Sequence, residues 1–201
     1  AGLLAVTGCG ADDLFITSDL GPNKDCEYVP EASLAREQAV FDLLWGAIST
    51  CEGEYFAHLL VENPNSDTVL VESAEVLLTT ARDQTIVFTD PQLPNPFVTK
   101  PASPLPAERT AVTSVEVIPD HYASQLEDFV DGTIIAHVSL SGTTSDGADL
   151  GSNVLDLPIE ICEGCRTLCR EADLVDRDIA EPECSDISIE FGRLWCIDPH
   201  C

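Results

Sequence analysis

The side chains with the greatest capacity for chemistry in this sequence are its cysteines. A reducing cytosol would leave so many thiols vulnerable to oxidation, whereas exported proteins use them as disulfides. We therefore expect an exported, oxidised chain. The odd count leaves one cysteine over, and the candidate for it is Cys9. The nine residues are Cys9, Cys26, Cys51, Cys162, Cys165, Cys169, Cys184, Cys196 and Cys201.

Cys9 ends a short apolar run that is typical of the C-terminal end of a signal segment. Val6-Thr7-Gly8-Cys9 closely resembles the bacterial lipobox, in which an aliphatic and two small residues precede the cysteine that receives the lipid. The resemblance implies a signal remnant over 1–8, lipidation of Cys9, and a membrane attachment made through that N-terminal lipid. Gly10, in place of the aspartate of an inner-membrane signal, favours the outer membrane. If Ala1 is instead a true processed terminus, Cys9 is an ordinary cysteine and one thiol stays unexplained.

The other eight cysteines predict four structural disulfides, with 105 connectivities left open. Cys26 and Cys51 flank one segment and are expected to pair, and six cysteines gather in the last 40 residues. A metal site is the alternative, since Cys162-x-x-Cys165 has the spacing of a zinc half-site and His200 adjoins Cys201. The second close pair of a zinc ribbon is missing from the sequence. We expect disulfides, no metal and no cofactor.

The charge balance of the chain is strongly acidic. Nine Lys and Arg stand against 36 Asp and Glu, which gives a net charge of −27 over 201 residues. Such a field repels phosphate backbones and argues against a nucleic-acid partner, while it attracts cations or a basic protein. A solvated acidic surface that maintains solubility is the simpler interpretation, because the carboxylates are dispersed along the chain.

Period-two alternation predicts a mainly β fold from residue 55 onward. Strands are expected around 55–62, 74–79, 85–89, 110–118, 133–140 and 155–161, with apolar residues on alternate positions. Residues 91–108 hold six of the 13 prolines and predict an extended crossing between sheets. Pro158, on the outward side of the last strand, predicts a sheet edge. Residues 34–50 fit either a helix or a short buried strand.

These segments predict an immunoglobulin-like antiparallel β-sandwich with an irregular, disulfide-rich C-terminal tail. The expected organisation is a signal-peptide remnant over 1–8, a lipid-anchored spacer over 9–33, the sandwich over 34–162 and the cysteine-rich tail over 163–201, packed on the sandwich. No stretch after Cys9 approaches the ~20 apolar residues that a membrane-spanning helix requires.

The run Leu157-Pro158-Ile159-Glu160-Ile161-Cys162-Glu163-Gly164-Cys165 and the short cysteine-spaced tail after it resemble cysteine-rich lipoproteins of myxobacteria and related bacteria. The stretches 55–78 and 132–140 add a generic β pattern to this likeness, which covers about residues 35–201. The resemblance implies the architecture and an envelope localisation. It carries no activity.

No catalytic motif accompanies the histidines, so we do not expect an enzyme. His58, His121, His137 and His200 lie on predicted strands or loops without a serine or cysteine motif beside them, and His137 is expected on the outward face of its strand. Ser145-Asp146-Gly147-Ala148-Asp149 has some calcium-loop character but lacks the later glutamate.

Two classes of function remain open. The first is a cell-envelope lipoprotein, on the periplasmic or surface face of the outer membrane, with a structural role or another envelope protein as its partner. The alternative is a small-molecule or metal-binding lipoprotein. An exposed apolar or aromatic patch would favour the first class, and a deep pocket with convergent polar groups the second.

Overall fold

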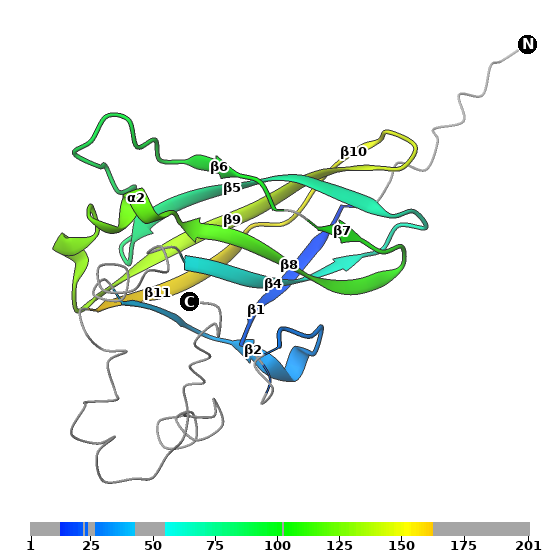
Figure 1. Ribbon diagram of the computed structural model, residues 1–201, viewed down its shortest axis with the longest axis horizontal. Coiled ribbons are helices and arrows are strands. Elements are labelled where there is room, and N and C mark those ends of the chain that lie inside the picture. Colours follow the sequence, from blue (N-terminus) through cyan, green and yellow to red (C-terminus); the bar gives the residue numbers. More distant parts are fainter. Residues whose placement is uncertain (1–12, 22, 24–26, 43–54, 102, 163–201) are drawn as a thin grey trace, which may run out of the picture.

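The protein folds as two β-sheets packed face to face, and the prediction of a mainly β sandwich is confirmed (Figure 1). The computed structural model describes residues 13–21, 23, 27–42, 55–101 and 103–162. One sheet has four strands in the order β2-β1-β4-β8. Their bounds are β1 Phe15–Leu20, β2 Ala35–Arg36, β4 Tyr55–Asn63 and β8 Arg109–Ile118.

The second sheet has seven strands and contains the longest ones. Its path is β3-β11-β9-β5-β6, with β10 paired to β9 and β7 paired to β5. The bounds are β3 Ala39–Asp42, β5 Val69–Thr80, β6 Phe97–Thr99, β7 Pro104–Leu105, β9 Gly132–Thr144, β10 Asp149–Gly151 and β11 Leu155–Cys162. Among the described residues, three short helices join strands: η1 Ala32–Leu34, α2 Asp120–Ala123 and η2 Glu127–Phe129.

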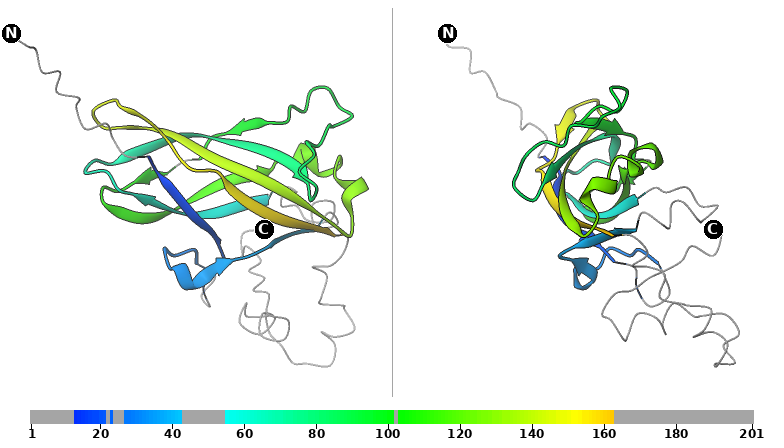
Figure 2. Two further views of the ribbon diagram at one scale, coloured as in Figure 1. Left: turned by 180° about the vertical axis from the view of Figure 1, so that it is seen from behind. Right: turned by 90° about the vertical axis from the view of Figure 1, so that its left-hand side faces the viewer.

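The core lies between the two sheets, which face each other in the end-on view of Figure 2. It is built from the alternate residues that the sequence pattern predicted as inward, because successive side chains of a strand point to opposite faces. These residues are at most 2% exposed and include Ala57, Leu59, Val61, Ala74, Val76, Leu78, Ile134, Ala136, Val138, Leu140, Leu157, Ile159 and Ile161. In the part of the chain that the structure describes, no helix is long and apolar enough to cross a membrane.

The N-terminal boundary of the sandwich differs from the prediction. Residues 9–33 were expected to be a spacer, yet Phe15–Leu20 is a strand that pairs with β4 and β2. The alternation that would have marked it is interrupted twice. A bulge shifts the register between Ile16 and Ser18, and a buried Asp19 occupies an inward position. Both features interrupt the alternation of apolar and polar residues from which a strand is predicted.

The segment 85–89 is also not the strand that its β-branched residues predicted. Thr85 forms only an isolated bridge with Thr79, while Ile86 and Phe88 turn their side chains into the core. The amide of Asn95 bonds to Leu78 of β5 and to Ile86, and so occupies the place that a continuing strand would take.

Two further segments refine the prediction at the edge of the seven-stranded sheet. Of the ambiguous residues 34–50, 39–42 form β3, and 43–50 lie outside the described residues. β3 runs parallel to β11 and pairs with it from Ile159 onward. β11 is therefore not an edge strand throughout, and Pro158 stands immediately before that ladder begins. The proline-rich stretch does cross between sheets, since β7 pairs in one and β8 in the other.

Asparagine side chains complete the backbone pairing where strands leave their neighbours. Asn153 Oδ1 accepts a hydrogen bond from Ile16 N at 2.7 Å, and its Nδ2 donates to Ile16 O at 3.0 Å, so that β1 is joined to the other sheet. Asn63 is fully buried, and its Nδ2 donates to three carbonyls, those of Asp67, Leu105 and Pro106. Buried backbone groups need such partners, because each one left unpaired costs about 1–3 kcal/mol.

The approach of β9 to β5 at Gly142 gives a test of this packing. A Cβ at Gly142 would lie 2.5 Å from Leu70 O and 3.1 Å from Val71 Cα, which are backbone atoms that cannot swing away. We expect Gly142→Ala to lower the free energy of unfolding by about 2–3 kcal/mol, measured by urea denaturation. Gly151→Ala is the matched control, since nothing lies within 4 Å of its Cβ. Equal stability of the two variants would contradict the packing described.

Candidate functional site

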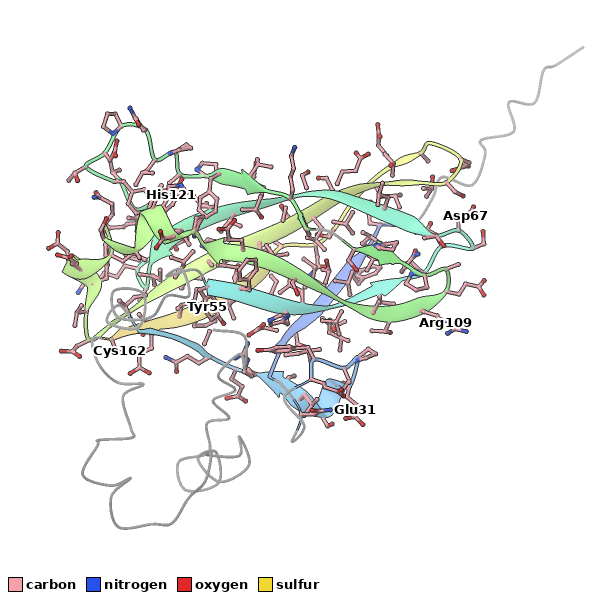
Figure 3. The ribbon with its side chains drawn as sticks, viewed as in Figure 1. Glu31, Tyr55, Asp67, Arg109, His121 and Cys162 are labelled. Atoms are coloured by element: carbon pink, nitrogen blue, oxygen red, sulfur yellow. The ribbon has the colours of Figure 1, made fainter. Side chains whose placement is uncertain are left out.

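The most deeply placed charged pair of the described residues joins Asp19 to Arg36. Arg36 Nη2 lies 2.7 Å from Asp19 Oδ2, and the aspartate side chain is fully buried. The pair arises from register, because β1 and β2 place Asp19 and Arg36 directly opposite each other. Tyr55, at the start of β4 (Figure 3), and Tyr28 both interact electrostatically with the guanidinium group.

Asp19 also serves the backbone of β4. Its Oδ1 accepts a hydrogen bond from His58 N at 3.0 Å. Burial raises the pKa of Asp19, and the opposing effects of Arg36 and of this amide do not cancel that rise. Burial also opposes the charge of Arg36, but Tyr55, Asp19 and Tyr28 outweigh it and the pKa of Arg36 is raised. The pair therefore fixes β2 and the segment before it against the four-stranded sheet.

His58 lies on the outward face of β4 and has two close partners. Ser114 Oγ, on β8, is 2.8 Å from His58 Nδ1, because the register places the two residues opposite each other. The ring of Tyr28 stacks on the imidazole, with 3.4 Å between ring centroids and 18° between ring planes. Burial, and secondarily the charge of Arg36, lower the pKa of His58 to about 4. The imidazole is neutral at pH 7.

Ser114 and His58 lack two properties of an acyl-transfer site. A general base works best with a pKa near the operating pH, and an imidazole with a pKa of about 4 is far below it. Within the described residues, no carboxylate is bonded to the ring of His58, whereas a triad requires one to orient the base. The pair is better suited to holding the Tyr28 segment against the sheet.

A second histidine cluster lies on the outward face of the seven-stranded sheet. His137 Nδ1 is 2.6 Å from Asp156 Oδ1, and Nε2 is 3.0 Å from Thr79 Oγ1 and 3.7 Å from Asp83 Oδ1. Asp83 follows β5 in a left-handed conformation, with φ of 61°. The cluster joins three neighbouring strands, because Thr79, His137 and Asp156 come from β5, β9 and β11.

The hydrogen bonds of this second cluster run in the order hydroxyl, imidazole, carboxylate. That order is the one found in hydrolase triads. Thr79 is only 2% exposed, however, so that a substrate carbonyl has no path to its hydroxyl. Among the residues that the structure describes, no group of three or more His, Cys, Asp or Glu side chains is arranged to hold a metal ion.

The outward face of the four-stranded sheet carries exposed aromatic side chains. Phe15 is 51% exposed, Phe56 41% and Tyr28 37%. Phe15 stands opposite Glu62, and Phe56 stands opposite Glu116. We call the outward residues of β1, β4 and β8, with Tyr28, the aromatic face. Its exposed members include Phe15, Tyr28, Phe56, Glu62 and Ser114, whereas His58, Val112 and Glu116 are half-buried and Leu60 is buried.

The structure describes only some of the site residues that were predicted from the sequence. Cys162, the last residue of β11, is disulfide-bonded, and Figure 3 places it at the end of the sandwich opposite Asp67 and Arg109. The other predicted disulfide cysteines, the lipidation site Cys9, and His200 lie outside the described residues. His137 is on the outward face as expected, whereas His121 lies in α2 and not in a loop.

The hydroxyl partners of both histidines were not predicted from the sequence. Ser114 and Thr79 are each more than 50 residues away along the chain from the histidine that they contact. Alternation could have shown that Ser114 points outward, but pairing it with His58 requires the strand register. The segment from Ser145 to Asp149, which has some calcium-loop character, bridges β9 and β10 as a turn closed by the bond between Thr144 N and Ala148 O.

Comparison with known proteins adds little to this description. No protein-family model matches the chain, and no curated protein matches it. It is similar to an X-ray structure from the Northeast Structural Genomics Consortium, at 10% identity and a TM-score of 0.33, over 61% of this chain and 81% of the other. It is also similar to the solution structure of a protein described as late embryogenesis abundant (LEA), at 15% identity and a TM-score of 0.33, over 75% and 70%. We draw no argument from likenesses at this level.

The lowered pKa of His58 predicts a specific pH dependence of stability. The pKa of His58 in the folded chain, about 4, lies below the ordinary value of 6.5. Between these two pH values the imidazole is therefore protonated in the unfolded chain and neutral in the folded chain. The contribution of His58 to the free energy of unfolding is therefore fully present above pH 6.5. It decreases as the pH drops toward 4, by about 2 kcal/mol at pH 5. His58→Gln should remove that part of the slope in urea denaturation at pH 7 and pH 5.

His121→Gln is the matched control for this experiment, since His121 is exposed. Its stability should fall between pH 7 and pH 5 as much as that of the unmodified chain. A slope unchanged by His58→Gln would show that the imidazole titrates freely.

Proposed function

We propose that the chain is an exported, lipid-anchored domain of the bacterial cell envelope, and that it acts by binding another protein. The aromatic face is the observation that carries this proposal. Soluble domains seldom leave large contiguous apolar surface uncovered without a partner. On the outward side of β4, Phe56 lies two residues before His58, and the ring of Tyr28 stacks on His58. The half-buried Val112 lies between these residues and Phe15, whereas Leu60 is buried.

The other large apolar side chains that are exposed in the described part of the chain are not aromatic. Leu70, Val87, Val98 and Val154 are aliphatic and belong to the seven-stranded sheet or to loops. Aromatic side chains are enriched at protein interfaces, because they present a large, rigid contact area. A single exposed aliphatic residue is ordinary on any surface.

Export and anchoring rest on separate support. The disulfide at Cys162 fits an oxidising compartment. The nine cysteines of the sequence agree with it, and the odd count is resolved by a lipid on Cys9. The lipobox-like Val6-Thr7-Gly8-Cys9 supplies the site for that lipid. A binding role for the sandwich would then be exercised at the membrane surface.

Intact mass spectrometry of the protein isolated from its native membrane tests the anchoring. We expect a mature chain that starts at acylated Cys9 and gains eight alkyl groups only after reduction. A chain that retains residues before Cys9, or thiols that are alkylated without reduction, would contradict the lipoprotein and disulfide assignments together.

Site-directed photo-crosslinking tests the binding role. We expect p-benzoyl-phenylalanine at position 56 to give a light-dependent adduct with another protein in the producing cell, because the probe replaces an exposed aromatic ring on the aromatic face. The same probe at position 98 is the matched control, since Val98 is 63% exposed on the other sheet. Equal adducts at both positions, or none at 56, would overturn the proposal.

A further inference from the structure

A short segment of the chain contacts the outward side of β4 and covers part of the aromatic face. His58 and Leu60 point to the same side of β4 as Phe56, which is 41% exposed, yet His58 is half-buried and Leu60 is buried. The ring of Tyr28 accounts for the covering of His58, because the two rings stack with 3.4 Å between their centroids. We call residues 27–34 the Tyr28 segment.

The Tyr28 segment packs only lightly on the rest of the sandwich. None of its residues is buried, and only Val29 and Leu34 are half-buried. Its backbone hydrogen bonds are mostly local: Glu31 N donates to Val29 O, Leu34 N donates to Glu31 O, and Leu34 O accepts from Gly21 N just after β1. A segment with few buried apolar contacts can open without unfolding the domain. The stack on His58 is therefore a principal contact between this segment and β4.

The surroundings of His58 make this stack sensitive to the charge of the imidazole. The groups packed around His58 are the Tyr28 ring, Ser114 Oγ at Nδ1, Asp19 Oδ1 at the backbone amide, the guanidinium of Arg36, and Glu116, the next outward residue of β8 after Ser114. Burial, and secondarily the charge of Arg36, lower the pKa of His58 to about 4. Protonation of the stacked imidazole would therefore place a second cation near Arg36, in a position with limited access to water.

The size of the pKa change decides whether protonation favours the stack or its release. An imidazole that is exposed to water has a pKa of 6.5, whereas the stacked His58 has a pKa of about 4. Because these values differ by about 2.5, protonation below pH 4 favours the released arrangement by up to about 300-fold. The attraction of an imidazolium to the Tyr28 ring opposes release by only about two- to fivefold at an exposed site.

We propose that the Tyr28 segment is an acid-released cover of the aromatic face. Tyr28 lies on His58 while the imidazole is neutral, and it leaves when the imidazole takes up a proton. His58 then joins Phe56 and Ser114 in one uncovered strip of the outward surface. This inference rests on the proposed function and adds the regulation of the same surface.

Fluorine NMR of the full oxidised chain labelled with 3-fluorotyrosine tests the release. The three tyrosines are Tyr28, Tyr55 and Tyr122, and Tyr28→Phe identifies the resonance of Tyr28. We expect this resonance to move between pH 6.5 and pH 4, because the shielding by the stacked imidazole is lost. A neutral gadolinium chelate, which reports exposure, should broaden it more at pH 4 than at pH 7. The Tyr55 resonance should stay in place, since Tyr55 is 6% exposed and reports on the folded sheet.

His58→Gln is the deciding variant, because glutamine has no proton to take up in this range. The Tyr28 resonance of this variant should keep its neutral position down to pH 4. His121→Gln is the matched control, since His121 is exposed in α2, and it should leave the transition unchanged. A transition that persists in His58→Gln would assign it to another group, such as Asp19, whose pKa is raised by burial, and would overturn the inference. A Tyr28 resonance that moves only together with that of Tyr55 would show unfolding and would also overturn it.

The photo-crosslinking assay separates this inference from the proposed function. Tyr28→Ala removes the covering ring, and we expect it to raise the yield of the adduct at position 56 several-fold at pH 7. An unchanged yield would refute the covering role while the adduct itself keeps the binding role. A normal Tyr28 transition with no adduct at position 56 in either chain would support acid release and refute the proposed function.

Discussion

The fold depends on pairing every buried backbone group at the places where the strands part. Ladders satisfy these groups inside each sheet, but the corners of the sandwich have no neighbouring strand to supply partners. Short polar side chains take that place. Asn153 pairs with both polar groups of Ile16, Asn95 bonds to Leu78 and Ile86, Asn63 serves three carbonyls, and Asp19 accepts the amide of His58. These bonds satisfy backbone groups that the ladders of the two sheets leave unpaired.

The same constraint explains the position of the aromatic face. Asp19 can accept the His58 amide only if its buried charge is balanced, and Arg36 supplies the balance. Arg36 in turn fixes β2, so that the segment carrying Tyr28 lies across the sheet and stacks on His58. The low pKa of His58 follows from this burial and from the nearby guanidinium. The position of the candidate site thus follows from the contacts that close the edge of the four-stranded sheet.

The sequence predicted those parts of the fold in which one physical rule acts alone. Alternation identified the inward residues of β4, β9 and β11, because burial on one side of a strand imposes a period of two. It failed at β1, where a bulge and a buried charged pair override the pattern, and at 85–89, where the Asn95 side chain replaces a strand. His58 and His137 were visible in the sequence. Their partners Ser114 and Thr79 were not, because register is decided by packing across the whole sheet.

The attachment of β1 has a mechanical consequence. The first described hydrogen bonds of the chain do not belong to one sheet: Leu14 N donates to Gly151 O, and Ile16 is held by Asn153, while Phe15 and Ile16 also pair with β4. A pull on the chain from its N-terminal side would meet both sheets at once. The load would be shared across the sandwich, and β1 would resist being separated from β4.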